Sequence, residues 1–223
     1  MSFQSKIEQS SLFRSFKAID AGEFRQIVRY YERYEQEVLQ LEFDEYFEIL
    51  VAYTNALFEI SEYKKHIKLA DIVIETSIIE NISEVNGQEI FQSTLFKKAS
   101  SHYNLFEYKK AIHVLQELLK IDPTDTDSSH FLEHCLREDK PQIAHHSRAI
   151  SVLFFLLAAF TVAIEMIVVR NFYPDLVSKI EFLRNAMFVL GLNILVLGVL
   201  WHRLKIYNEV QQFINCVKKT KKK

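Results

Sequence analysis

The chain has 223 residues, of which 49% are hydrophobic and 25% charged, and its formal net charge is −2 at pH 7. This length allows one domain of ordinary size and a small second unit. Four glycines and three prolines are too few for the turns of a β-sandwich or barrel, so the composition predicts an all-α chain. Only two cysteines are present, Cys135 and Cys216, which excludes a disulfide framework and predicts two reduced thiols.

Seven helices are predicted before residue 140, because apolar side chains recur there at helical spacing. The predicted ranges are Lys6–Ala21, Glu23–Leu41, Phe43–Ile60, Ser61–Ile79, Gln88–Asn104, Phe106–Ile121 and 126–137. The expected boundary residues are Gly22 as a C-cap, Ser61 as an N-cap, Asn86-Gly87 as a turn between two helices, Pro123 as a helix end, and Asp125 or Thr126 as the last N-cap.

Three stretches of this region are similar to one another: AGEFRQIVRYY at 21–31, ISEYKKHIKLA at 60–70 and LFEYKKAIHVL at 105–115. In each, a glutamate precedes an aromatic residue, Phe24, Tyr63 or Tyr108, and an aliphatic residue follows that aromatic four positions later. The spacings of 39 and 45 residues predict a helix-turn-helix repeat with connections of variable length.

The third copy carries small residues at Ala99 and Ala111, the aromatic Tyr108, and the ending Ile121-Asp122-Pro123. This pattern resembles the tetratricopeptide family over about residues 7 to 138, although His66 and Ile27 replace the small residue in the other two copies. The resemblance implies an α-solenoid of about three helical hairpins with a capping helix, within a domain at residues 1–140. Armadillo-like or irregular helical hairpins are the alternative.

Tetratricopeptide domains bind peptide segments or partner helices in a concave groove, and the resemblance therefore implies a protein partner. The groove residues carried over by alignment are Val51, Asn55, Phe58, Phe96, Ser100, Tyr103 and Asn104. The family's clamp for a C-terminal carboxylate needs a Lys or Arg beside the asparagine, and here Val51 precedes Asn55, which argues against that ligand. The alternative is that several of these aromatic residues pack inside the solenoid.

Two apolar runs follow, Ala149–Val169 with Glu165 as its only charge, and Asn185–Trp201 with none. About 20 apolar helical residues cross the roughly 30 Å core of a bilayer. The runs predict a transmembrane hairpin with spans at 149–170 and 185–204. A short extracytoplasmic loop with the start of the next helix, at 171–184, joins the spans. A juxtamembrane connector at 141–148 precedes the hairpin, and a basic tail at 205–223 follows it. Two buried helices of a soluble core are the alternative.

Charge predicts how the hairpin is oriented. Residues 1–148 hold 17 basic and 25 acidic side chains, whereas residues 202–223 hold seven basic ones and a single glutamate. Basic residues accumulate on the cytoplasmic side, so both termini are expected in the cytoplasm, at a bacterial inner membrane or the cytosolic face of an organelle. The residues expected to meet anionic headgroups are Arg203, Lys205, Lys218, Lys219, Lys221, Lys222 and Lys223. Nucleic acid is not expected as a partner, because no other basic face accompanies this tail.

Polar residues within the apolar runs are candidates for helix contacts. Glu165 is expected to pair with Arg170 or Arg184, or to lie between hairpins of different copies. Asn193 and the glycines at 191 and 198 predict close helix contact within one hairpin or between copies, and hence a possible homo-oligomer. The stretch from Ser178 to Glu181 has the pattern of a capping box that starts the second span.

One motif suggests chemistry. His130, Glu133 and His134 match the HxxEH pattern of zinc hydrolases, with Cys135 beside them. Three fixed positions arise easily by chance in a chain with eight histidines, and the region downstream offers no third ligand outside the apolar runs and the tail. We therefore expect no catalytic residue, no metal and no cofactor.

These features predict a membrane-anchored adaptor or scaffold, in which a cytoplasmic repeat domain captures a protein and the hairpin holds it at the bilayer. The alternative is an oligomeric membrane effector or channel, with Glu165 and Asn193 at contacts between clustered hairpins.

Overall fold

The computed structural model describes residues 10–140, 142–169 and 173–221. It is about 83% helical, which confirms the all-α prediction. The chain divides into two compact units, Met1–Leu132 and Glu133–Lys223. The division falls inside a helix, α8 (Thr126–Asp139), eight residues before the boundary expected at residue 140. Each unit is described by itself.

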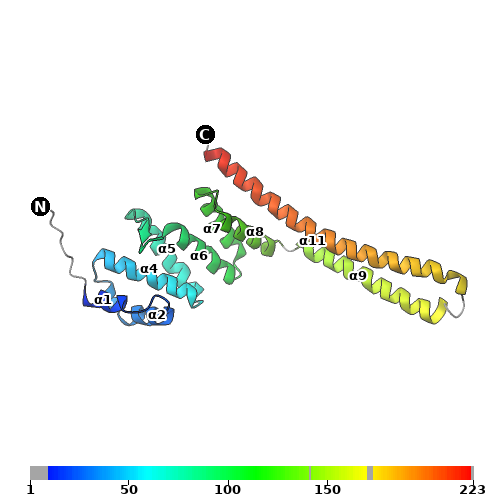
Figure 1. Ribbon diagram of the computed structural model, residues 1–223, viewed down its shortest axis with the longest axis horizontal. Coiled ribbons are helices and arrows are strands. Elements are labelled where there is room, and N and C mark those ends of the chain that lie inside the picture. Colours follow the sequence, from blue (N-terminus) through cyan, green and yellow to red (C-terminus); the bar gives the residue numbers. More distant parts are fainter. Residues whose placement is uncertain (1–9, 141, 170–172, 222–223) are drawn as a thin grey trace. The chain divides into compact units, whose positions relative to one another are not determined.

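The first unit consists of consecutive helices that pack side by side (Figure 1). Its elements are α1 (Ser11–Lys17), α2 (Phe24–Arg33), α3 (Glu35–Val38), α4 (Phe43–Glu59), α5 (Tyr63–Ile79), β1 (Glu84–Val85), β2 (Gln88–Glu89), α6 (Phe91–Asn104), α7 (Tyr108–Ile121) and the first half of α8. Helix α2 packs on α4, α4 on α5, α5 on α6, and α6 on α7. This order of neighbours follows the order of the sequence, because the links between long helices are short.

Two sets of apolar side chains form the interior of the first unit. The N-terminal set is centred on α4, where Phe47, Ile49, Leu50 and Leu57 are at most 2% exposed. The C-terminal set contains the small residues predicted for the third copy, Ala99 and Ala111, together with Leu115, Leu118 and Leu119. All of these side chains are buried, because each lies on the face of its helix that packs against neighbouring helices.

The three similar stretches share one backbone conformation. Glu23, Glu62 and Glu107 each occupy the N-cap position of their helix, with φ/ψ of −87°/59°, −80°/55° and −88°/55°. Ser61 and Phe106, which directly precede two of these glutamates, have positive φ values of 66° and 60°. Ser61 is therefore not the N-cap that was predicted, because its left-handed backbone ends α4 and the cap of α5 falls one residue later.

Three other boundary predictions are wrong. Helix α1 ends at Lys17 with Ala18 as its C-cap, so Gly22 caps no helix. The predicted second helix breaks at Tyr34, which separates α2 from α3. Asn86-Gly87 joins no helices directly, since it is the two-residue turn of the β1–β2 hairpin, with φ values of 53° and 74°. An Asn-Gly pair favours this turn strongly enough to form a hairpin of only two residues per strand.

The helix ends around α7 and α8 match the predictions. Helix α7 ends at Ile121, two residues before Pro123. The carboxylate of Asp125 accepts hydrogen bonds from the backbone N–H groups of Asp127 and Ser128, at 3.0 and 3.4 Å. Asp125 is thus the N-terminal cap of α8.

The second unit contains two long helices that pack side by side (Figure 1). Its elements after α8 are α9 (Gln142–Ile164), the π-helix η1 (Glu165–Val169), the 3₁₀ helix η2 (Pro174–Leu176) and α11 (Val177–Lys221). Helix α11 continues without a break for 45 residues. The predicted capping box is wrong, because Ser178 lies inside the first turn of α11 and not at its N-cap.

The apolar side chains of these two helices are largely exposed. Leu156 and Phe160 on α9 are each 63% exposed, and Phe182 and Trp201 on α11 are 76% and 67% exposed. The helices His145–Ile167 and Val177–Lys221 are long and apolar enough to cross a membrane, because each contains an 18-residue stretch of high mean hydropathy, 2.4 in the first and 1.9 in the second. A helix of a soluble core buries such side chains, so the exposure indicates association with a membrane.

Candidate functional site

The first unit contains a cleft of about 510 Å³. It is lined by Phe16, Lys17, Ile19, Ala21, Phe24, Ile27, Glu48, Val51, Ala52, Asn55, Glu59, Val85, Asn86 and Lys97. These residues come from α1, the connection that follows it, α2, α4, α6 and the β1–β2 hairpin, so segments from residue 16 to residue 97 build one site. Apolar side chains form most of the lining, and two polar groups interrupt it.

The first polar group joins α4 to α6. The ammonium group of Lys97 donates a hydrogen bond to Asn55 Oδ1 at 2.9 Å and lies 5.7 Å from the ring centre of Phe58. Its contact with the Glu59 carboxylate is longer, at 4.0 Å. Burial lowers the pKa of Lys97, and Glu59 partly opposes this shift. The cleft therefore contains a partly desolvated cation, one that a carboxylate of a ligand would stabilise.

The second polar group connects α1, α4 and the β1–β2 hairpin. The Asn86 amide donates to Glu48 Oε1 at 2.7 Å, and its Oδ1 accepts from Lys17 at 3.5 Å. Lys17 also forms an ion pair with Glu48. These contacts hold the turn of the β1–β2 hairpin against the cleft, so a segment predicted to be a simple connection contributes a wall.

Two of the seven predicted groove residues, Val51 and Asn55, line this cleft. Phe58 lies beside it and packs its ring against Tyr63 and His66, with centroids 6.0 and 5.3 Å apart. The cation that the alignment found missing beside Asn55 is Lys97, supplied by another helix. Sequence reasoning overlooked Lys97, although it lies three residues before Ser100 and so on the helix face that had been chosen.

The other predicted groove residues lie on α6 toward α8. Phe96 and Tyr103 each pack against Phe131 of α8, with both centroid distances at 5.5 Å. The Asn104 amide donates to the Ser100 carbonyl at 3.0 Å, within the same helix. These aromatic residues follow the alternative reading, in which they pack between helices. Of the seven predicted residues, Val51 and Asn55 line the cleft, and a groove that joins all seven stays a prediction.

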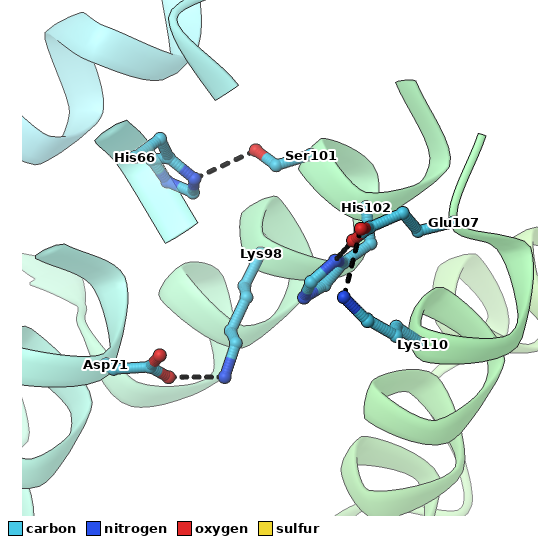
Figure 2. Close-up of polar contacts among 7 residues, drawn as sticks. All are labelled: His66, Asp71, Lys98, Ser101, His102, Glu107 and Lys110. Carbon is cyan, nitrogen blue, oxygen red and sulfur yellow. Dashed lines mark hydrogen bonds and ion pairs between the residues drawn. The ribbon is translucent and has the colours of Figure 1, made fainter. Parts of the chain in front are cut away.

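A buried polar pair lies between α5 and α6 (Figure 2). Ser101 Oγ and His66 Nδ1 are 2.8 Å apart, and both side chains are fully buried. Burial, with the positive charges of Lys97 and His102, lowers the pKa of His66 to about 4. Among the described residues, His66 Nε2 is a buried atom with no hydrogen-bond partner. Because no solvent reaches this pair, it acts as a contact between helices.

Three ion pairs surround this contact (Figure 2). His102 Nδ1 lies 2.7 Å from Glu107 Oε2, and Lys110 Nζ lies 2.9 Å from Glu107 Oε1. Both basic groups lower the pKa of Glu107, Lys110 more strongly. Lys98 pairs with Asp71 between α6 and α5. Together these contacts connect three consecutive helices.

The HxxEH residues lie on α8. Leu132 and Leu136 are buried, whereas His130 and His134 are exposed. Within the described residues, no group of three or more His, Cys, Asp or Glu side chains is placed to hold a metal ion. Cys135 is fully buried, and burial raises the pKa of its thiol to about 12.

The two polar residues predicted within the apolar helices, Glu165 and Asn193, have different surroundings. Glu165 is 1% exposed and accepts a hydrogen bond from Arg184 Nη1 at 2.9 Å, so of the two expected partners the structure shows Arg184. Arg170 lies outside the described residues. The Asn193 side chain is exposed and donates to the Val189 carbonyl at 2.9 Å.

The glycines of α11 face α9. A Cβ atom at Gly191 would lie 3.0 Å from the Phe155 ring, and one at Gly198 would lie 2.2 Å from Ser147 Cβ. Close contact therefore occurs within one hairpin at these two positions, which is one of the two arrangements expected from the sequence.

The basic residues of the tail are all helical and exposed where they are described. Arg203, Lys205, Lys218, Lys219 and Lys221 belong to α11. Lys222 and Lys223 lie outside the described residues.

Comparison with protein-family models, with curated proteins and with solved structures finds no match to this chain. Its function is therefore argued from its own residues.

Proposed function

We propose that this protein is a membrane-anchored adaptor, in which the α9–α11 hairpin spans a bilayer and the first unit binds a protein segment in its cleft. The observation that carries the proposal is the exposure of large apolar side chains along both α9 and α11. Exposure of this apolar surface to water costs a large free energy, whereas contact with lipid chains carries no such cost.

The dimensions of the hairpin support the anchor. The 23 residues from His145 to Ile167 form a helix of about 35 Å, enough for a hydrocarbon core of about 30 Å. Trp201 then lies near one interface, with Arg203 and Lys205 directly after it. Both termini are on one side of a hairpin, and its basic flank favours the cytoplasmic side.

The continuous helix α11 changes what the tail is expected to do. Lys218 lies about 17 residues beyond Trp201, or about 25 Å further along the helix axis. This exceeds the screening length of about 8 Å at physiological ionic strength. Arg203 and Lys205 are therefore the residues that meet anionic headgroups in this proposal, and the terminal lysines extend into the cytoplasm when the helix stands upright.

The first unit supports a tetratricopeptide-like array, because its hairpins pack in sequence order and its three copies share one N-cap conformation. Its cleft of about 510 Å³ has the size typical of ligand sites, roughly 300 to 1,000 Å³. Apolar walls suit an aliphatic or aromatic side chain of a peptide or partner helix. Lys97 suits an acidic side chain beside it.

An oligomeric membrane effector remains the second candidate, favoured by the exposed Asn193 amide on an apolar helix. Glu165 argues for the anchor instead. Its charge is paired with Arg184 inside the hairpin, so it does not need a second hairpin for neutralisation.

Two measurements test the adaptor. Full-length protein in native membranes should stay in the pellet after alkaline carbonate extraction. Protease should digest the first unit when it is added on the cytoplasmic side of the membrane, and not when it is added on the opposite side. Recovery of protein in the carbonate supernatant would overturn the anchor.

The cleft is tested by affinity purification from those membranes. Ala21→Trp fills the cleft from an exposed position, and Lys97→Glu reverses its cation. Both variants should lose the same co-purifying protein, whereas the control Lys109→Glu, on the exposed surface of α7, should retain it. A partner that all three variants retain would show that the cleft is not its binding site.

A further inference from the structure

We infer that α11 pairs with α11 of a second copy of this chain, through a row of exposed residues on the side facing away from α9. The inference rests on the proposed membrane anchor, because it concerns the lipid-facing surface of that helix. It makes the protein a parallel homodimer within the bilayer.

Helix α11 already uses one face against α9. Arg184 bonds Glu165, Met187 Sδ lies 3.9 Å from Thr161 Oγ1, and Gly191 approaches Phe155. These three positions follow one another at spacings of three and four residues. This is the period with which one helix packs along another.

A second face has the same period. Its residues are Phe182, Ala186, Val189, Asn193, Val196 and Leu200, and we call them the outer seam. The spacings alternate between four and three residues over the whole row. Gly198, which approaches Ser147, also belongs to the first face. Each position of the second row lies two residues from Arg184, Met187, Gly191 or Gly198, which is a rotation of about 200° around the helix. The outer seam is therefore on the opposite side of α11 from α9.

The outer seam is not covered in the described structure. Phe182 is 76% exposed, Val189 53%, Val196 44% and Leu200 49%, and Asn193 is exposed while Ala186 is half-buried. From Ala186 to Leu200, Asn193 is the only residue whose side chain carries a nitrogen or oxygen atom. Its bond to the Val189 carbonyl uses one of two N–H groups and leaves the amide oxygen available.

The partner that best fits the outer seam, with its single carboxamide at Asn193, is a second copy of this chain. All copies inserted with the same topology place α11 in the same direction, so Asn193 of one copy meets Asn193 of the other at the same depth. A carboxamide both donates and accepts, which makes it complementary to itself across a two-fold axis. A single Asn in an otherwise apolar seam also sets the register of parallel helices.

Disulfide cross-linking in native membranes tests the outer seam. A background with Cys135→Ala and Cys216→Ser removes both natural thiols. Val189→Cys and Leu190→Cys then place one thiol at nearly the same depth, at positions 53% and 51% exposed, but only residue 189 belongs to the outer seam. Oxidation should give a dimer with Val189→Cys and at least about fivefold less with Leu190→Cys, because about 100° of helix rotation separates them.

Asn193→Leu in the Val189→Cys protein should lower the cross-linked fraction at high lipid dilution, by weakening association about 3- to 30-fold. Equal cross-linking at positions 189 and 190, or no cross-linking at either in carbonate-resistant protein, would overturn the outer seam and leave the anchor standing. Release of the protein by carbonate would instead overturn the anchor itself.

Discussion

The side chains of Glu165 and Arg184 meet at 2.9 Å across the two apolar helices. Glu165 is the first residue of the π-helix that follows α9, and Arg184 lies in the second turn of α11. Only 2% of the Glu165 side chain is exposed, against 30% of Arg184. A carboxylate so placed needs a cation close by, because apolar surroundings disfavour an isolated charge.

This contact predicts a measurable coupling between the two helices. In a double-mutant cycle with Glu165→Gln and Arg184→Gln, we expect a coupling energy of about 1 to 3 kcal/mol. The measurement is unfolding of the full-length protein in mixed micelles by denaturing detergent. The pair Lys120–Glu117 is the control, since both side chains are about half exposed and their coupling should stay below about 0.5 kcal/mol. Similar coupling for both pairs would refute a special role for Glu165.

His66 predicts how stability depends on pH. Its pKa in the folded chain is about 4, below the usual 6.5, so folding favours the neutral ring. Its contribution is therefore complete above about pH 6.5 and is lost as the pH falls toward 4. A difference of about 2.5 pKa units corresponds to about 3 kcal/mol. The lowered pKa of Glu107 acts in the same direction.

Pulse proteolysis in urea at pH 7 and pH 4.5 would measure this change on the full-length protein in detergent. His66→Gln keeps a polar side chain near Ser101 and removes the titration, so its stability should depend much less on pH. If the wild type and His66→Gln lose the same stability between these pH values, the buried histidine is not the cause.

Phe106 predicts a stabilising substitution. Its φ of 60° is costly for a bulky residue, and its side chain is 78% exposed, so little packing offsets the strain. Phe106→Gly should be more stable to unfolding than Phe106→Ala by about 1 kcal/mol, because only glycine adopts this φ without strain. The same urea experiment compares the two variants. Equal stability would mean that the left-handed conformation at this position carries no strain.

Much of the local structure was predictable from the sequence. The repeat pattern predicted small residues at Ala99 and Ala111, both of which are buried, and Asp125 was one of the two caps expected for α8. These features depend on neighbours within a few residues along the chain. The β-hairpin at Asn86-Gly87 also depends on local residues, but it was not predicted. The scarcity of other strand patterns favoured a connection between helices, whereas the Asn-Gly turn preference in fact forms a hairpin.

The candidate site was less predictable. Alignment selected Val51 and Asn55, which line the cleft, together with Phe96 and Tyr103, which pack on α8. The same pattern therefore covered residues with different surroundings. Lys97 and Asn86 were missed, because each approaches the cleft from an element whose position depends on packing between helices.

By itself the sequence determined the helical class, the two apolar segments and the self-similar turns, because composition and hydrophobic period act through local geometry and solvent preference. Tertiary structure alone decided that Glu165 pairs with Arg184, that Lys97 reaches Asn55, and that Asn193 faces away from α9. Those relationships depend on the rotation of each helix about its own axis. Side-chain packing between neighbouring helices sets that rotation, and no single stretch of sequence contains it.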